Sequence, residues 1–160
     1  MEKVFHVPCD YSYNAGEYDD KRRRPSVTQL KYEYAYDVEA LARDIVSKLG
    51  MSWIKMENVG FIRSTGSKSH AVARIYGLPR SFQVAFKMPA SYVIEVISEK
   101  YDKLPYEEKV EVIIHELLHI SSSFSGGLRP HGKIVNARNV KKLKEKYLKS
   151  LTLKEKYQFL

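Results

Sequence analysis

Two histidines, His115 and His119, lie four residues apart in a segment whose apolar residues recur at helical spacing. Placed at 100° per residue, the apolar side chains fall on the side of a helix opposite the two histidines. These apolar residues are Val110, Ile113, Ile114, Leu117 and Ile120. The pattern predicts a helix over about 105–121 that is buried on one side, so other elements must cover that side.

The spacing of the two histidines fits metal binding. Side chains one helical turn apart have Cβ atoms about 6 Å from each other. Both imidazoles can therefore reach one Zn²⁺ ion at about 2.0–2.1 Å. Glu116 lies about 100° further round the helix, where it can contact a water on the metal. The run from His115 to His119 thus predicts two zinc ligands and a glutamate general base, with two ordinary surface or core histidines as the alternative.

A catalytic zinc ion needs a third protein ligand and an open fourth position. His131 is the leading candidate, because the loop 122–130 contains Gly126 and Gly127 and can return the chain to the helix. Glu145, on the helix expected next, is the alternative third ligand. A metzincin arrangement would require a third histidine where this chain has Ser125.

The remainder of the chain shows further helical and strand patterns. Asp37 suits a helix N-cap, and Gly50 suits the end of the same helix. Short runs rich in β-branched and aromatic residues predict strands. The expected helices span about 37–49, 105–121 and 133–148, and the expected strands span 59–62, 71–76, 82–86 and 92–97. This order predicts an α+β fold: one compact domain over 1–160, with a small, mainly antiparallel sheet packed on the histidine-bearing helix, flanking helices, and an irregular segment over 1–28.

Composition supports a protein with a packed core. The 160 residues are 44% hydrophobic, without the roughly 18–20 consecutive apolar residues of a membrane-spanning helix. The first residues lack the apolar run of a secretory signal, so we expect a soluble, cytoplasmic protein. Cys9 is the only cysteine, so any metal must be held by histidine and carboxylate. His6 is close to Cys9 in sequence, but we expect an ordinary thiol and structural or surface roles for His6 and His70.

The net charge of +8 introduces a second class of function. A basic surface favours contact with nucleic acid or acidic proteins. Solvated helix faces and heat adaptation also account for many lysines. The basic residues form a run over 21–24 and a second group at Lys141, Lys142, Lys144, Lys146 and Lys149. Contact with nucleic acid through this basic surface is therefore one candidate function among several. The sequence predicts no oligomeric state.

Two segments beside the histidine helix carry a family resemblance. With that helix, the segments 73–79 and 125–132 resemble metallopeptidases found in archaea and phages, over about 61–148. The helix and the pair His131-Gly132 also resemble SprT-like (Spartan-type) zinc peptidases. The resemblance implies a zincin-like domain in which the zinc ligands are His115, His119 and His131, and Glu116 is the general base. The chain departs from SprT-like proteins in two ways: residues 134–136 lack the aromatic residue that those proteins have there, and one cysteine cannot build their C-terminal zinc ribbon. The zinc chemistry of that family therefore transfers well to this chain, but its role in cutting proteins attached to DNA transfers poorly.

These observations predict a zinc-dependent metallopeptidase that hydrolyses a peptide or protein substrate. Arg129 or a tyrosine is expected to stabilise the oxyanion, and the strand 92–97 is expected to align an extended peptide by backbone pairing. The alternative is a zinc-stabilised module that binds nucleic acid or protein without turnover. A structural zinc ion would have four protein ligands, whereas a catalytic one would keep a position for water.

Overall fold

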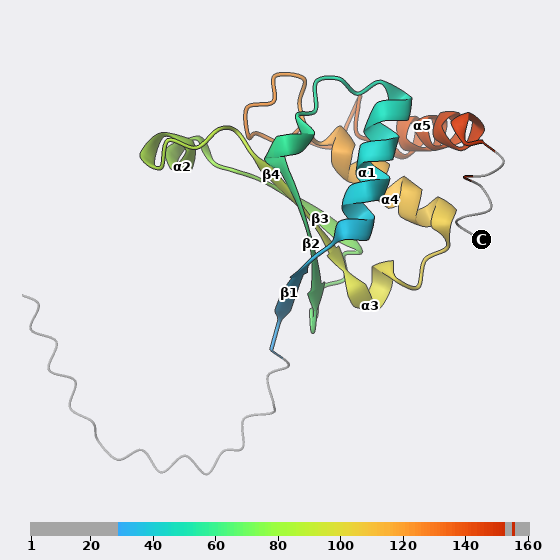
Figure 1. Cartoon of the computed structure of the whole chain (residues 1–160), viewed down its shortest axis with the longest axis horizontal. Helices are drawn as coiled ribbons and strands as arrows, with labels where there is room; N and C mark the ends of the chain where they lie inside the picture. Colours follow the sequence, from blue (N-terminus) through green and yellow to red (C-terminus); the bar gives the residue numbers. More distant parts are fainter. Residues whose placement is uncertain (1–28, 153–154, 156–160) are drawn as a thin grey trace, which may run out of the picture.

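A four-stranded sheet forms the centre of the protein (Figure 1). The computed structural model describes residues 29–152 and 155. The strands are β1 (Lys31–Tyr34), β2 (Val59–Thr65), β3 (Ala73–Gly77) and β4 (Tyr92–Ile97), arranged in the order β1-β2-β4-β3. The central pair, β2 and β4, is parallel, and the two outer pairs are antiparallel. The expected small, mainly antiparallel sheet in an α+β fold is therefore confirmed.

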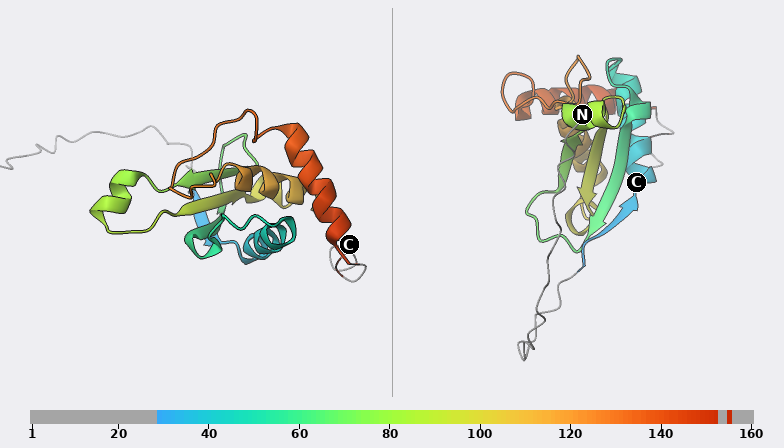
Figure 2. Two further views of the ribbon diagram at one scale, coloured as in Figure 1. Left: turned by 90° about the horizontal axis from the view of Figure 1, so that it is seen from above. Right: turned by 90° about the vertical axis from the view of Figure 1, so that its left-hand side faces the viewer.

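Three long helices accompany the sheet. They are α1 (Tyr36–Leu49), α4 (Tyr106–Leu118) and α5 (Ala137–Ser150). Helices α1 and α4 lie against one face of the sheet, and α5 packs against both of them (Figures 1 and 2). Shorter elements are the 3₁₀ helix η1 (Met56–Asn58), α2 (Arg80–Ala85) and α3 (Ser98–Tyr101).

The hydrophobic core lies between this face of the sheet and the helices. Strand residues Phe61, Ile94 and Val96 are fully buried there. The expected apolar side of α4 is confirmed, because Val110, Ile113, Ile114, Leu117 and Ile120 are all fully buried. One side of α4 is thus fixed in the core, which determines where its other side points.

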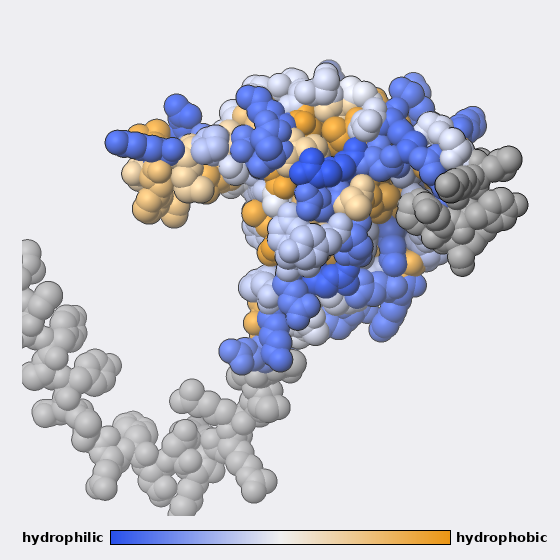
Figure 3. Space-filling view, in the orientation of Figure 1, coloured by the Kyte–Doolittle hydropathy of each residue, from blue (hydrophilic) through white to orange (hydrophobic). Residues whose placement is uncertain are grey.

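The predicted strand over 82–86 is wrong, because this segment forms the short helix α2. The helix lies at the tip of an arm between β3 and β4, away from the sheet (Figure 2). Its apolar residues Phe82, Val84 and Phe86 are exposed, and Figure 3 shows this apolar surface on the arm. Strand-like residues there have no neighbouring strand to pair with, and Pro79 starts a helical turn by accepting from the Gln83 N–H.

Other boundaries differ by a few residues. Helix α4 ends at Leu118 rather than 121, and α5 runs over 137–150 rather than 133–148. Asp37 is not the N-cap of α1; Ala35 occupies that position, and the Asp37 carboxylate binds the guanidinium of Arg63. Strand β1, which the sequence analysis did not identify, is only four residues long and is exposed along its whole length, including its aromatic residues Tyr32 and Tyr34.

Two further expectations concern the N-terminal segment and membrane-spanning helices. The segment 1–28, with His6, Cys9 and the basic run over 21–24, lies outside the described residues. Among the helices that the structure describes, none has both the length and the apolar character needed to cross a bilayer.

Candidate metal centre

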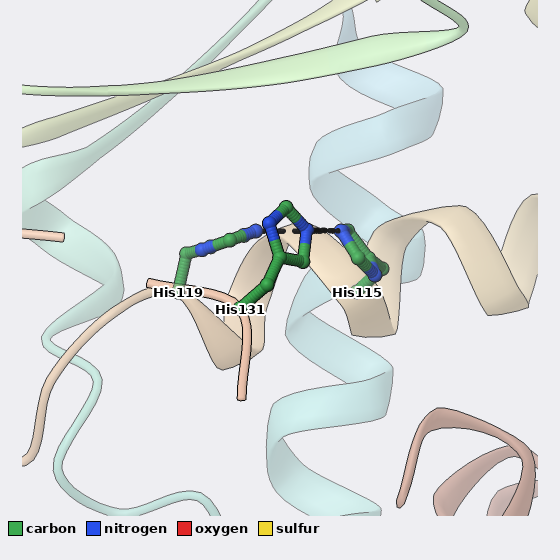
Figure 4. A group of neighbouring side chains, drawn as sticks. All are labelled: His115, His119 and His131. Atoms are coloured by element: carbon green, nitrogen blue, oxygen red, sulfur yellow. Dashed lines mark hydrogen bonds between the residues drawn. The ribbon is translucent and has the colours of Figure 1, made fainter. Parts of the chain in front are cut away.

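Three imidazole rings converge at the end of α4 (Figure 4). His115 lies in the last turn of the helix, and His119 directly follows its last residue. The backbone of His119 is still helical, with φ −67° and ψ −20°, so the one-turn spacing of the two rings is preserved. His131 comes from the loop after the helix. The His115 Nε2 atom lies 3.3 Å from Nε2 of His119 and 3.1 Å from Nε2 of His131.

These distances suit a single tetrahedral ion. Two nitrogens that each lie about 2.0–2.1 Å from one tetrahedral zinc ion are roughly 3.4 Å apart. The Nδ1 atom of His119 lies 2.6 Å from the carbonyl oxygen of Arg129 and donates to it, which leaves the lone pair on Nε2. The pKa of His115 is lowered, chiefly by burial and further by the neighbouring His119 and His131. A lowered pKa favours the neutral ring, which is the form that binds metal. The three histidines therefore fit an imidazole-bound cation such as Zn²⁺.

Backbone hydrogen bonds in the loop between α4 and α5 hold His131 close to the end of α4. The Arg129 N–H donates to the carbonyl of His119 at 2.7 Å, next to an antiparallel bridge between Ile120 and Leu128. The Gly132 N–H then donates to the carbonyl of Val135 at 2.9 Å. His131 thus lies between two backbone hydrogen bonds that hold the loop in place.

Buried polar side chains anchor the first half of this loop to the sheet and the arm. The Tyr92 hydroxyl accepts from the Gly126 N–H at 2.9 Å and donates to the Gly127 carbonyl at 3.0 Å. The amide of Gln83, which is buried in the otherwise exposed α2, donates to the carbonyls of Leu78 and Ser125. Gly126 has φ +89°, a backbone conformation that favours glycine.

Glu116 lies beside the histidine cluster and is only 8% exposed. Burial raises the pKa of this carboxyl group to about 7. A cation held by the neighbouring histidines would favour its ionised form. Burial and a cation on the histidines would therefore act in opposite directions on the pKa of the residue that the sequence suggested as a base.

A pocket of about 370 Å³ opens beside this cluster. It joins His115, Glu116 and His131 to the segment that begins β3 and to the start of α5. In the described part of the chain, β3 pairs only with β4 and is an edge strand. The expectation that the strand 92–97 forms the rim of the site is wrong, because β4 is paired on both sides and cannot add a peptide.

Other predicted residues lie elsewhere. Glu145 is exposed on α5 and does not belong to the histidine cluster, whereas His131 does. His70 is also exposed and separate from it. The Arg129 guanidinium lies 3.4 Å from the carbonyl of Leu118. Sequence reasoning missed the Arg129 carbonyl as the partner of His119, since a backbone atom leaves no signal in side-chain spacing.

Comparison with known proteins identifies a family. A family model described as "Putative phage metallopeptidase" matches residues 30–152, which include all of α4 and His131. Neither the curated proteins nor the solved structures gave a match. The family match covers most of the 160 residues. The chain therefore belongs to the phage metallopeptidase family.

Proposed function

We propose that this protein is a zinc-dependent metallopeptidase in which His115, His119 and His131 hold the metal and Glu116 is the general base. The observation that carries the proposal is the convergence of three imidazole Nε2 atoms beside a buried carboxyl group. Membership of a metallopeptidase family supports the same reaction. The helix with His115 and His119 and the pair His131-Gly132 are the features that resemble SprT-like peptidases, and we include a relation to them in the proposal.

Each side chain of the centre has a defined task. When bound by the histidines, zinc supplies Lewis-acid chemistry, which activates water and polarises the scissile carbonyl. Glu116 accepts a proton from the attacking water as oxygen bonds to the carbonyl carbon. The carbon–nitrogen bond then breaks, and Glu116 delivers the proton to the departing amine. The bond from His119 Nδ1 to the Arg129 carbonyl keeps the His119 ring in its ligating orientation.

The sheet offers a way to align a peptide substrate. An extended chain can add to an exposed edge strand through main-chain hydrogen bonds, and β3 is the edge strand next to α4. The pocket beside the histidines is open to this edge, since Ala71, Val72 and Ala73 form one of its walls. We therefore assign the alignment of substrate to β3 rather than β4.

The test compares wild-type protein with Glu116→Gln in the presence of zinc. We expect wild-type protein to bind one zinc ion and cleave an unfolded protein substrate. Glu116→Gln should still bind zinc but lose cleavage by about 10²–10⁴-fold, the usual contribution of a general base. Glu108→Gln, an exposed change on the same helix, is the matched control and should cleave normally. Cleavage by Glu116→Gln at the wild-type rate would overturn the role of Glu116, and failure of the wild-type protein to bind zinc would overturn the ligand set.

A second candidate function is binding of nucleic acid or protein without turnover. Four lysines of α5 are exposed and supply positive charge: Lys141, Lys142, Lys146 and Lys149. Lys144, by contrast, is bound to Glu111. Binding to DNA that weakens steeply with added salt would support this candidate. A fourth protein ligand on the metal, in place of water, would also favour it.

A further inference from the structure

We propose that two copies of this chain associate through strand β1, which pairs in the antiparallel sense with the β1 strand of the other copy. Strand β1 is the outer strand of the sheet on the side opposite β3 (Figure 1). In the described part of the chain it pairs only with β2, so its outer edge is unpaired. Such an edge exposes backbone N–H and C=O groups that a further strand can bind. The inference is independent of the proposed function.

The backbone groups of alternate residues of β1 point away from β2. The Ala35 N–H donates to the Phe61 carbonyl at 3.0 Å, and this pair continues the register between β1 and β2. In an antiparallel ladder, residues that bond to one neighbouring strand alternate with residues whose N–H and C=O face the other side. Lys31 and Glu33 therefore bond to β2, as Ala35 does. The backbone groups that face outward are those of Tyr32 and Tyr34.

The tyrosine side chains of β1 lie on the face of the sheet away from the helices. Tyr34 lies opposite Ile62, whose neighbour Phe61 faces the core, and successive side chains of a strand point to opposite faces. Tyr32 shares the face of Tyr34. Tyr32 is 55% exposed and Tyr34 is 45% exposed, and Leu30, directly before the strand, is 43% exposed. The outer edge of β1 is therefore accompanied by uncovered apolar surface.

The other face of β1 carries one charge of each sign. Lys31 and Glu33 are exposed and lie two residues apart, on the same face of the strand. The residue opposite Glu33 on β2 is Arg63, whose guanidinium is already bound by Asp37 and Asp102. Glu33 is therefore available to a second cation. A lysine on an edge strand opposes pairing, but a carboxylate two residues away can offset its charge in a symmetric pair.

The two charges select one register. A twofold axis perpendicular to the sheet makes the two β1 strands antiparallel and keeps the helix-covered faces of both copies on the same side. With this axis at Tyr32, Lys31 of each copy lies opposite Glu33 of the other. An axis at Lys31 or at Glu33 would instead place like charges opposite each other, which is destabilising. The sequence of β1 is thus complementary to itself in a single arrangement.

Every cross-strand pair in this register is of a stabilising type. Two pairs join Lys31 to Glu33, the central pair joins Tyr32 to Tyr32, and Leu30 meets Tyr34 on the same face. Opposite-charge and aromatic pairs both stabilise antiparallel strands. The outward N–H and C=O of the two Tyr32 residues bond to each other, so the two four-stranded sheets become one. A second copy of the chain therefore fits this edge in backbone, charge and apolar surface together.

Charge reversal tests the pairing. Sedimentation equilibrium of the full chain, over about 1–500 µM, should show a dimer with a dissociation constant on the order of 10–100 µM, because the interface is small. Lys31→Glu and Glu33→Lys should each weaken association about 10–100-fold, since each turns two attractive pairs into two repulsive ones. Lys141→Glu makes the same change of charge at an exposed position of α5 and should dimerise as wild type does.

An equimolar mixture of the two variants provides the matched test. The β1 strand of Lys31→Glu carries two carboxylates, and that of Glu33→Lys carries two ammonium groups, so opposite charges meet again in a mixed dimer. We expect the mixture to associate within about threefold of wild type. Far-UV circular dichroism shows that each variant is folded. A monomeric wild-type protein, or a mixture of folded variants that does not associate, would overturn the proposal. Dimers of Lys31→Glu as tight as wild type would also overturn it, and would point to another surface, such as the exposed apolar residues of α2.

A disulfide locates the twofold axis. In a Cys9→Ser background, Tyr32→Cys places the two thiols on opposite residues, whose Cα atoms are about 5.5 Å apart, within the span of a disulfide. Tyr34→Cys is the control, because its two copies would lie about 14 Å apart, beyond that span. After mild oxidation, non-reducing electrophoresis should show a covalent dimer for Tyr32→Cys alone. No covalent dimer of Tyr32→Cys, or equal amounts for the two variants, would overturn the assigned register.

Discussion

His119 and Arg129 are joined by two hydrogen bonds in opposite directions. The His119 ring donates from Nδ1 to the Arg129 carbonyl at 2.6 Å, and the Arg129 N–H donates to the His119 carbonyl at 2.7 Å. The end of α4 and the loop that carries His131 are therefore attached to each other at a ligand. The orientation of the His119 ring and the position of His131 therefore both depend on the backbone of Arg129.

We predict that the backbone of Arg129, and not its side chain, supports metal binding. Arg129→Ala keeps the carbonyl and the N–H and should bind zinc within about threefold of wild type, whereas Arg129→Pro removes the N–H and should weaken binding about 10–100-fold. Competition with a chromophoric chelator measures both affinities, and thermal unfolding shows that both variants fold. Equal losses in the two variants would contradict the prediction. A loss of kcat in Arg129→Ala with zinc still bound would indicate the oxyanion role that the sequence suggested.

The third ligand is tested by two alanine variants. His131→Ala should weaken zinc binding by at least about 100-fold, more than the loss of a second-sphere partner, because three protein ligands are the usual set at a catalytic zinc ion. Glu145→Ala should bind one zinc ion as wild type does, since Glu145 is outside the histidine cluster. Elemental analysis after dialysis at a fixed free zinc concentration gives the answer. Loss of zinc from Glu145→Ala alone would reverse the assignment.

Gly126 is predicted to be essential for the stability of the loop. A Cβ atom at this position would lie 2.3 Å from Nε2 of Gln83 and 2.4 Å from the carbonyl oxygen of Leu78, and φ is +89°. Gly126→Ala should therefore lower the free energy of unfolding by about 2–4 kcal/mol. At Gly127 the nearest atom to such a Cβ is Ser125 Oγ at 3.9 Å, so Gly127→Ala should change it by less than about 1 kcal/mol. Urea unfolding of the two variants tests the difference, and equal losses would contradict it.

The part of the fold predicted from the sequence is the part governed by hydrophobic periodicity. The apolar stripe on α4 has to face the core, so the same pattern that identifies the helix also predicts the direction of His115 and His119. The end of α1 at Gly50 follows from its left-handed backbone, with φ +67°. Local rules were sufficient wherever one residue or one helical face determined the result.

The errors arose where partners distant in sequence determine the structure. Asp37 has the residue type of an N-cap, but Arg63 on β2 binds its carboxylate. The apolar pattern of β4 predicts a buried strand but does not show which strands pair with it. Its place at the centre of the sheet, rather than at the rim, could therefore not be predicted. Phe82 and Phe86 looked like strand residues because the sequence does not show that α2 lies on an arm outside the sheet. In each case the structure is decided by contacts between residues that are far apart in sequence, and no local sequence pattern shows those contacts.

The final prediction is that the loop carrying His131 keeps its structure when the metal is removed. The loop is held by Tyr92, Gln83 and the backbone of His119, none of which requires an ion. The amides of Gly126 and Arg129 donate to the Tyr92 hydroxyl and the His119 carbonyl, and the amide of Gly132 donates to the Val135 carbonyl. All three should exchange slowly with deuterium even after chelation.

Chelation should still lower the thermal stability. Free zinc at 100 times its dissociation constant adds about 2.7 kcal/mol, which corresponds to roughly 5–10 °C in Tm for a chain of this size. Hydrogen exchange and thermal unfolding, each with and without chelator, distinguish the two effects, and His131→Ala should show no Tm response to moderate zinc. A loop that is already fixed by backbone hydrogen bonds loses only the binding free energy of its metal on chelation, so its Tm falls while its amides stay protected. Fast exchange at Gly126 and Arg129 after chelation would instead mean that the ion organises the loop.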